Sequence, residues 1–180
     1  MGERAALIVI DMLNRYEHED AESLIVSVRE VLPAMRELVG RARERDTPIV
    51  YVNDNYGDWS ASRSELCASA LEGRRRALVA PILPPAGAAF VTKARHSIFY
   101  ETSLDYLLRS RQIDRLILIG QVTEQCILYS ALDAYVRHYR VTVPHDAVAH
   151  IHTDLAGAAL EMMKRNMRAE IVGAERALSE

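Results

Sequence analysis

The sequence has little excess charge of either sign. Its 180 residues include 22 Lys and Arg against 25 Asp and Glu, a formal net charge of −3 at pH 7. Proteins that bind nucleic acid without regard to base sequence need a strongly basic surface, so this balance excludes that class. The three arginines at residues 74–76 form too short a run to change this interpretation, and we expect no nucleic-acid partner.

Long apolar runs are also missing. None approaches the roughly 20 residues that a helix needs to cross a bilayer. The first apolar run, at residues 5–10, is short and is followed at once by Asp11, which argues against a signal sequence. We therefore expect a cytoplasmic protein with no membrane partner.

Cysteine is scarce, and repeats and linkers are absent. With only Cys67 and Cys126 in the chain, a disulfide framework is not expected, and each thiol must be judged by its surroundings. The composition is 49% hydrophobic and 26% charged, as in ordinary globular proteins. We expect one domain over residues 1–180, which buries roughly 70% of the surface of the unfolded chain.

Apolar runs of strand length alternate with segments of helical periodicity. Between the first two runs, apolar residues recur at three- and four-residue spacing over residues 24–39, with a kink or a restart expected at Pro33. Residues 102–105 fit a capping box that opens a short helix. The six predicted strands are residues 5–10, 48–52, 89–92, 115–120, 139–143 and 169–172; further helices are predicted at 126–136 and 153–166, with loop and short helix at 54–85.

This alternation predicts a three-layer α/β fold with a six-stranded parallel sheet and helices on both of its faces. In such sheets the ligand crevice lies beyond the carboxyl ends of the strands. The residues that directly follow the apolar runs are therefore the first functional candidates. They are Asp11, Asn53, Asp54, Lys93 and the turn at 120–126.

Cys126 occupies the position of a nucleophile. It follows a buried strand and a turn that contains Gly120, at the expected start of a helix, where backbone amides favour a thiolate. From position alone, a buried structural cysteine is an equal alternative, and Cys67 is best explained in that way. Two other strand ends supply complementary groups: Asp11 can act as base and acid, and Lys93 can keep that carboxylate charged.

Three motifs in matching order then resemble the isochorismatase-like cysteine hydrolase superfamily, which includes nicotinamidases and N-carbamoylsarcosine amidases. The first is Asp11-Met-Leu-Asn14, in which Leu13 replaces the usual Gln. The second runs from Lys93 to Leu104 and matches Lys-x-x-x-Ser-x-Phe-x-x-Thr-x-Leu at every defined position. The third is Gly120-Gln-Val-Thr-Glu-Gln-Cys126, which matches Gly-x-x-Thr-x-x-Cys.

The resemblance implies a Rossmann-like isochorismatase fold and a catalytic triad of Asp11, Lys93 and Cys126. It also implies a cis peptide between Gln121 and Val122, with the backbone amides of Val122 and Cys126 forming an oxyanion hole. Relatives are commonly dimers or larger, so we expect a homo-oligomer. Glu124 stands where the family usually has Asp, and its role is left open.

No metal or other cofactor is expected. Nicotinamidases of the family bind a metal through Asp-x-His, whereas this chain has Asp54-Asn-Tyr56 at the matching place. One carboxylate without imidazole partners is a poor transition-metal site. His150 and His152 form a second candidate cluster, which is better explained as a loop before a helix capped by Thr153 or Asp154.

The resemblance and the strand-end residues predict a hydrolase that cleaves a C–N bond of a small amide or ureide through a thioester on Cys126. One alternative is hydrolysis of a vinyl ether, as in isochorismatase, with Asp11 as acid. The other is a catalytically silent binding or assembly protein. Aromatic side chains predicted to wall the substrate pocket are Tyr16, Tyr56, Trp59, Phe99 and Tyr129, and His96 is expected to be a solvated loop residue.

Overall fold

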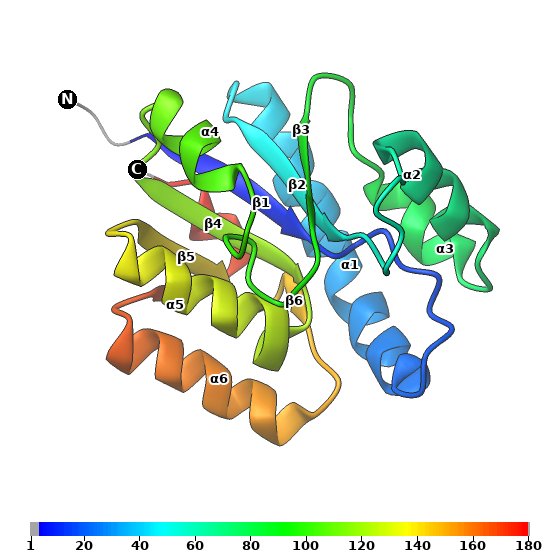
Figure 1. Cartoon of the computed structure of the whole chain (residues 1–180). Helices are drawn as coiled ribbons and strands as arrows, with labels where there is room; N and C mark the ends of the chain where they lie inside the picture. The colour runs from blue at the N-terminus through cyan, green and yellow to red at the C-terminus, as the bar shows by residue number, and fades with distance from the viewer. Residues whose placement is uncertain (1–3, 180) are drawn as a thin grey trace.

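Seven strands form one sheet in the computed structural model, which describes residues 4–179 (Figure 1). Their order is β3-β2-β1-β4-β5-β7, and β6 pairs with β4 beside this path. Every pairing is parallel. The strands are β1 (Ala5–Ile10), β2 (Ile49–Asp54), β3 (Ala89–Lys93), β4 (Arg115–Gln121), β5 (Arg140–Pro144), β6 (Val148–Ala149) and β7 (Glu170–Val172).

All six predicted strands are confirmed, and so is the parallel three-layer fold. Strand β6 was not predicted, because two residues are too few to produce a recognisable pattern. The predicted domain of 1–180 includes residues 1–3 and 180, which lie outside the described residues. Within the described part of the chain, no helix is both long and apolar enough to cross a membrane.

Helices cover both faces of the sheet. One face carries α1 (Ala21–Glu44), α2 (Arg63–Glu72), α3 (Arg76–Val79) and α7 (Ala174–Ala177); the other carries α4 (Leu104–Ser110), α5 (Leu128–Val136) and α6 (Thr153–Asn166). Strand β1 serves both layers, because Leu7 and Val9 enter one apolar cluster while Ile8 and Ile10 enter the other. The continuous apolar run thus reflects burial on both faces.

A kink or a restart was predicted at Pro33, and the restart is wrong, because helix α1 runs through Pro33 without interruption. Pro33 is exposed, while the residues around it, including Val31, Leu32 and Met35, are buried against the sheet. A proline costs a helix one hydrogen bond and some strain, and the packing of the apolar face outweighs that local cost.

Two predicted helix caps are also wrong. Helix α4 begins at Leu104 without the predicted capping box, because its N-cap is Ser103, whose side chain makes no cap hydrogen bond. Thr102 Oγ1 accepts the amide of Leu104 at 3.4 Å and donates to the carbonyl of Ile98 at 2.6 Å. Helix α6 begins at the predicted residue, but its N-cap is His152, and neither Thr153 nor Asp154 caps it. Short polar side chains near a helix start have several possible partners, and the tertiary structure selects among them.

The two central strands approach closely at Gly120. Its φ is +119°, and a Cβ placed on it would lie 2.1 Å from the carbonyl oxygen of Ile10. A larger residue would therefore push β4 away from β1. This approach sets the turn after β4 directly beside Asp11.

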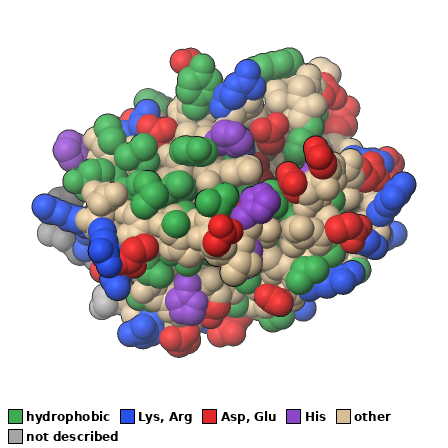
Figure 2. Space-filling model, turned by 90° about the horizontal axis from the view of Figure 1, so that it is seen from below, with side chains coloured by type: hydrophobic (Ala, Val, Ile, Leu, Met, Phe, Trp, Pro, Cys, Tyr) green, Lys and Arg blue, Asp and Glu red, His purple; other side chains and the backbone are tan. Residues whose placement is uncertain are grey.

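The outer surface carries charges of both signs. Figure 2, which views the molecule from below, shows acidic, basic, hydrophobic and histidine side chains on the same face. Such a mixture agrees with the small net charge of −3 at pH 7.

Candidate active site

The carboxyl edge of the sheet brings Asp11, Lys93 and Cys126 together. Asp11 follows β1, Lys93 ends β3, and Cys126 lies in the π-helical turn η2 (Thr123–Ile127) after β4. Lys93 Nζ lies 2.8 Å from Asp11 Oδ2 and 3.6 Å from Cys126 Sγ. Three residues spread over more than half of the chain thus share one cluster.

Asp11 is held in an uncommon backbone conformation. Its φ is +56°, a left-handed value that few residues other than glycine adopt. Its carbonyl accepts a hydrogen bond from Gln121 Nε2 at 2.6 Å, and its Oδ1 accepts one from the backbone amide of Asp54 at 2.8 Å. Bonds from both neighbouring strands therefore fix the carboxylate.

Lys93 and Asp11 form a buried ion pair. Their side chains are 1% and 10% exposed. Burial raises the pKa of Asp11, and the charge of Lys93 opposes this only in part. Burial by itself lowers the pKa of Lys93, but the nearby acidic groups, Asp11 first, raise it above the usual value. Lys93 therefore stays an ammonium, and a second carboxylate, Asp54 Oδ2, lies 3.7 Å from it.

Cys126 is a neutral thiol in this setting. Burial raises its pKa, and the charge of Asp11 raises it further; Lys93 and a hydrogen bond from the backbone amide of Val122 oppose the shift. The expectation that the helix start lowers the pKa of this thiol is wrong, because desolvation and a carboxylate outweigh it. To act as a nucleophile, such a thiol would need a base beside the sulfur to remove its proton.

The peptide between Gln121 and Val122 is cis, as predicted. The backbone amide of Val122 acts to lower the pKa of Cys126, which places this amide near the sulfur. This placement is compatible with an oxyanion hole formed by the amides of Val122 and Cys126, a role that stays a prediction.

A cavity of about 290 Å³ opens onto the thiol. Its wall includes Asp11, Gln121 and Cys126, together with the exposed residues Tyr56 and His96. Tyr56 is fixed by a hydrogen bond from its hydroxyl to the carbonyl of Leu13 at 2.9 Å. Of the five aromatic residues predicted to wall the pocket, Tyr56 is the one that lines this cavity.

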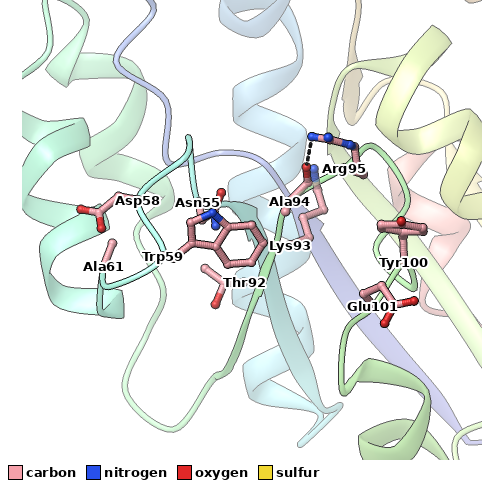
Figure 3. Close-up of a pocket in the computed structure, with 10 residues that line it drawn as sticks. All are labelled: Asn55, Asp58, Trp59, Ala61, Thr92, Lys93, Ala94, Arg95, Tyr100 and Glu101. Carbon is pink, nitrogen blue, oxygen red and sulfur yellow. Dashed lines mark hydrogen bonds between the residues drawn. The ribbon is translucent and has the colours of Figure 1, made fainter.

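Trp59 and Tyr129 lie beside that cavity and not in its wall. Trp59 is 83% exposed and lines a neighbouring cavity of about 390 Å³, together with Lys93 and Tyr100. Figure 3 shows the indole of Trp59 next to Asn55 and Lys93. Tyr129 packs its ring on His96, with ring centres 5.4 Å apart.

Tyr16 and Phe99 are buried and line neither cavity, which corrects their predicted place in the pocket wall. Tyr16 is 3% exposed, and its hydroxyl donates to Gln121 Oε1 at 3.2 Å. Phe99 is 5% exposed, and its ring stacks on Tyr139 under the guanidinium of Arg137. Their large apolar rings pack in the core. A sequence pattern does not distinguish a ring in the core from a ring in a pocket wall.

The candidate metal ligands are engaged elsewhere. His150 places its Nδ1 3.0 Å from Ser27 Oγ and its Nε2 3.2 Å from Thr153 Oγ1. Asp54 Oδ1 accepts the backbone amide of Tyr56 at 2.7 Å. Among residues 4–179, no group of three or more His, Cys, Asp or Glu side chains is placed to hold a metal ion. The absence of a metal cofactor stays a prediction.

The side chains of Gln121 and Glu124 make hydrogen bonds around the site that were not predicted. Gln121 links Tyr16 to the Asp11 backbone, and the signal for it was a polar residue at the end of a buried run. Glu124, whose role was open, accepts the amides of Ile151 and His152 at 2.9 and 2.8 Å through Oε1. It thereby ties the turn of Cys126 to the start of α6.

Comparison with known proteins agrees with this geometry. The family model described as "Isochorismatase domain" matches residues 5–176. The chain belongs to the isochorismatase family. It is 34% identical over 170 residues to the uncharacterized isochorismatase family protein YaaI of Bacillus subtilis, and the match covers 94% of each chain.

Two other family members have named activities. The chain is 28% identical over 162 residues to maleamate amidohydrolase of Pseudomonas putida, with 85% of this chain and 76% of that protein covered. The crystal structure of N-carbamoylsarcosine amidase from Thermoplasma acidophilum superposes with a TM-score of 0.74 at 28% identity, covering 96% of this chain and 97% of the other. These similarities support a hydrolase of the isochorismatase family.

Proposed function

We propose that the protein is a cysteine hydrolase that cleaves the C–N bond of a small amide or ureide through a thioester on Cys126. The observation that carries this proposal is the contact of one buried ammonium with both a carboxylate and a thiol. Lys93 Nζ lies 2.8 Å from Asp11 and 3.6 Å from Cys126. No packing requirement explains placing these three groups together under a cavity.

In the first half of the reaction, Asp11 takes the proton of the thiol as the sulfur attacks the substrate carbonyl. The raised pKa of Cys126 makes a free thiolate costly, so proton transfer and attack occur together. Lys93 offsets the negative charge that builds up, and the amides of Val122 and Cys126 hold the oxyanion.

The tetrahedral intermediate then breaks its C–N bond. Asp11 returns its proton to the departing nitrogen, which leaves as ammonia or an amine, and the acyl group stays on Cys126. Water hydrolyses the thioester and releases the acid. The cavity of about 290 Å³ fits a substrate of few atoms.

The named activities of two relatives support the reaction class. Maleamate amidohydrolase and N-carbamoylsarcosine amidase both act on C–N bonds, as their names state. The proposal extends that class to this chain. A homo-oligomeric state and a cytoplasmic location stay predictions.

The test is release of ammonia from a panel of small primary amides and ureides by the wild-type protein and by Cys126→Ala. We expect turnover of at least one member by the wild type only. Equal turnover by both proteins would overturn the covalent step. Pyruvate release from isochorismate by both proteins would instead support acid catalysis by Asp11, and no turnover of any compound would favour the silent binding protein.

A further inference from the structure

The sulfur of Cys126 has a second side that the proposed triad does not use. Nδ1 of His96 lies 3.7 Å from Sγ, nearly as close as Lys93 Nζ at 3.6 Å. His96 lies in the loop after β3, three residues beyond Lys93, and is exposed. The proposed nucleophile thus contacts both the ammonium of a buried ion pair and an exposed imidazole.

An aromatic contact holds this imidazole in place. The ring centres of His96 and Tyr129 are 5.4 Å apart with an angle of 34° between the ring planes. Tyr129 belongs to α5, which continues directly from the turn that carries Cys126. One short segment therefore carries both the nucleophile and the support of the histidine.

Both carboxylate oxygens of Asp11 already have partners. Its Oδ1 accepts the amide of Asp54 at 2.8 Å, and its Oδ2 accepts Lys93 Nζ at 2.8 Å. Asp11 lines the cavity, but its side chain is only 10% exposed. His96 lines the same cavity and is exposed, so a water molecule from solvent can reach its ring.

We propose that His96 is a further catalytic residue that acts as the base in hydrolysis of the thioester. The proposal rests on the covalent mechanism proposed above. Water adds to the thioester carbonyl and passes a proton to Nδ1 of His96. The tetrahedral intermediate then breaks its C–S bond, releases the acid, and the imidazolium returns the proton to Sγ, which restores the thiol.

The test separates the two halves of the reaction with p-nitrophenyl acetate as the probe. Acetylation of Cys126 releases p-nitrophenolate in a burst, and hydrolysis of the acetyl thioester sets the steady rate. We expect His96→Gln to keep the burst and to lower the steady rate by about 100-fold, the lower range for general-base catalysis. Mass spectrometry then finds acetyl groups that persist on Cys126.

The control is His138→Asn, which changes another exposed histidine at the end of α5. The φ of His138 is +68°, and Asn tolerates that conformation. This variant should keep both rates. In His96→Ala, added imidazole should restore the steady rate, which a purely structural role of His96 would not allow.

The possible failures are distinct. If His96→Gln keeps the wild-type steady rate, or if imidazole has no effect on His96→Ala, the role of His96 is overturned while the thioester stands. If the wild type shows no burst and no acetyl group on Cys126, the covalent mechanism itself fails and the role of His96 fails with it.

Discussion

The two cysteines of the chain have similar chemistry in isolation and different surroundings. Cys67 lies on α2, half-buried against one of the two apolar clusters, and Cys126 is buried at the carboxyl edge of the sheet. Burial raises the pKa of both thiols. Arg63 opposes the shift at Cys67, while Asp11 adds to the shift at Cys126.

Thiol pKa therefore does not distinguish the proposed nucleophile from the other cysteine, because it is raised at both. Cys126 differs from Cys67 by having a carboxylate, an ammonium and an imidazole around its sulfur, under a cavity. Groups that can accept and return a proton allow a neutral thiol to act as a nucleophile, because the thiol then loses its proton as it attacks the substrate. The following variants test this difference, from the largest expected effect to the smallest.

Replacement of each cysteine by alanine should give the largest difference in kcat between the two sites. Cys126→Ala removes the proposed nucleophile and should lower kcat by at least about 1,000-fold. Cys67→Ala should leave kcat within about twofold, because Cys67 contacts no proposed reacting group. Steady-state kinetics with an accepted amide provide the measurement. A similar loss in both variants would show that the contrast between the cysteines is wrong.

The ion pair should matter for both activity and stability. Lys93→Met leaves the buried Asp11 carboxylate without its cation, which should lower the free energy of unfolding by about 3 kcal/mol. It should also lower kcat by about 100-fold or more. The matched control is Lys164→Met, which alters the only other lysine, an exposed residue of α6. Urea unfolding and kinetics check both variants. Equal free energies of unfolding for the two would contradict a stabilising ion pair.

The glycines near the two cysteines should differ in how well they tolerate replacement by alanine. Gly120→Ala would bring a Cβ within 2.1 Å of the Ile10 carbonyl oxygen in the centre of the sheet, so we expect a loss of about 3 kcal/mol in the free energy of unfolding. A Cβ on Gly73, which ends the helix of Cys67, would lie 2.7 Å from Arg15 Cα, which belongs to a loop and not to the sheet. Gly73→Ala should cost about 1 kcal/mol. Urea unfolding that ranks the two in the opposite order would show that the sheet adjusts more easily than the loop.

The pH dependence of alkylation tests the electrostatics of the two thiols. Because the Asp11 charge raises the pKa of Cys126, Asp11→Asn should lower that pKa and speed alkylation of Cys126 by iodoacetamide at pH 8. Each unit of lowering corresponds to about a tenfold increase in thiolate. Alkylation of Cys67 serves as the internal control and should not change. Site-resolved mass spectrometry measures both, and slower alkylation of Cys126 would contradict a repulsive Asp11.

Much of this architecture was predictable from the sequence. The apolar runs correctly predicted the six strands, because strands buried on both faces need continuous apolar residues. Parallel strands end at one edge, so polar residues after those runs were correctly expected to meet there. Asp11, Lys93 and Cys126 follow from this rule, and all three come together in the structure.

The errors arise where partners are chosen in three dimensions. Tyr16 and Phe99 were predicted as pocket walls, yet both are buried in the core. Thr102 was predicted to open a capping box, yet the N-cap is Ser103 and the Thr102 hydroxyl donates to Ile98. An aromatic ring or a hydroxyl has several favourable environments, and its local sequence does not select one of them.

The sequence by itself determined the order of strands and helices, the parallel sheet and the residues at its carboxyl edge, because periodicity and strand ends depend on local residue patterns. Only the tertiary structure decided the protonation of Cys126 and the placement of His96 against its sulfur. Both depend on burial and on charges carried by distant parts of the chain. Desolvation and electrostatic interaction act across space, so they are defined only when the strand ends and loops have come together.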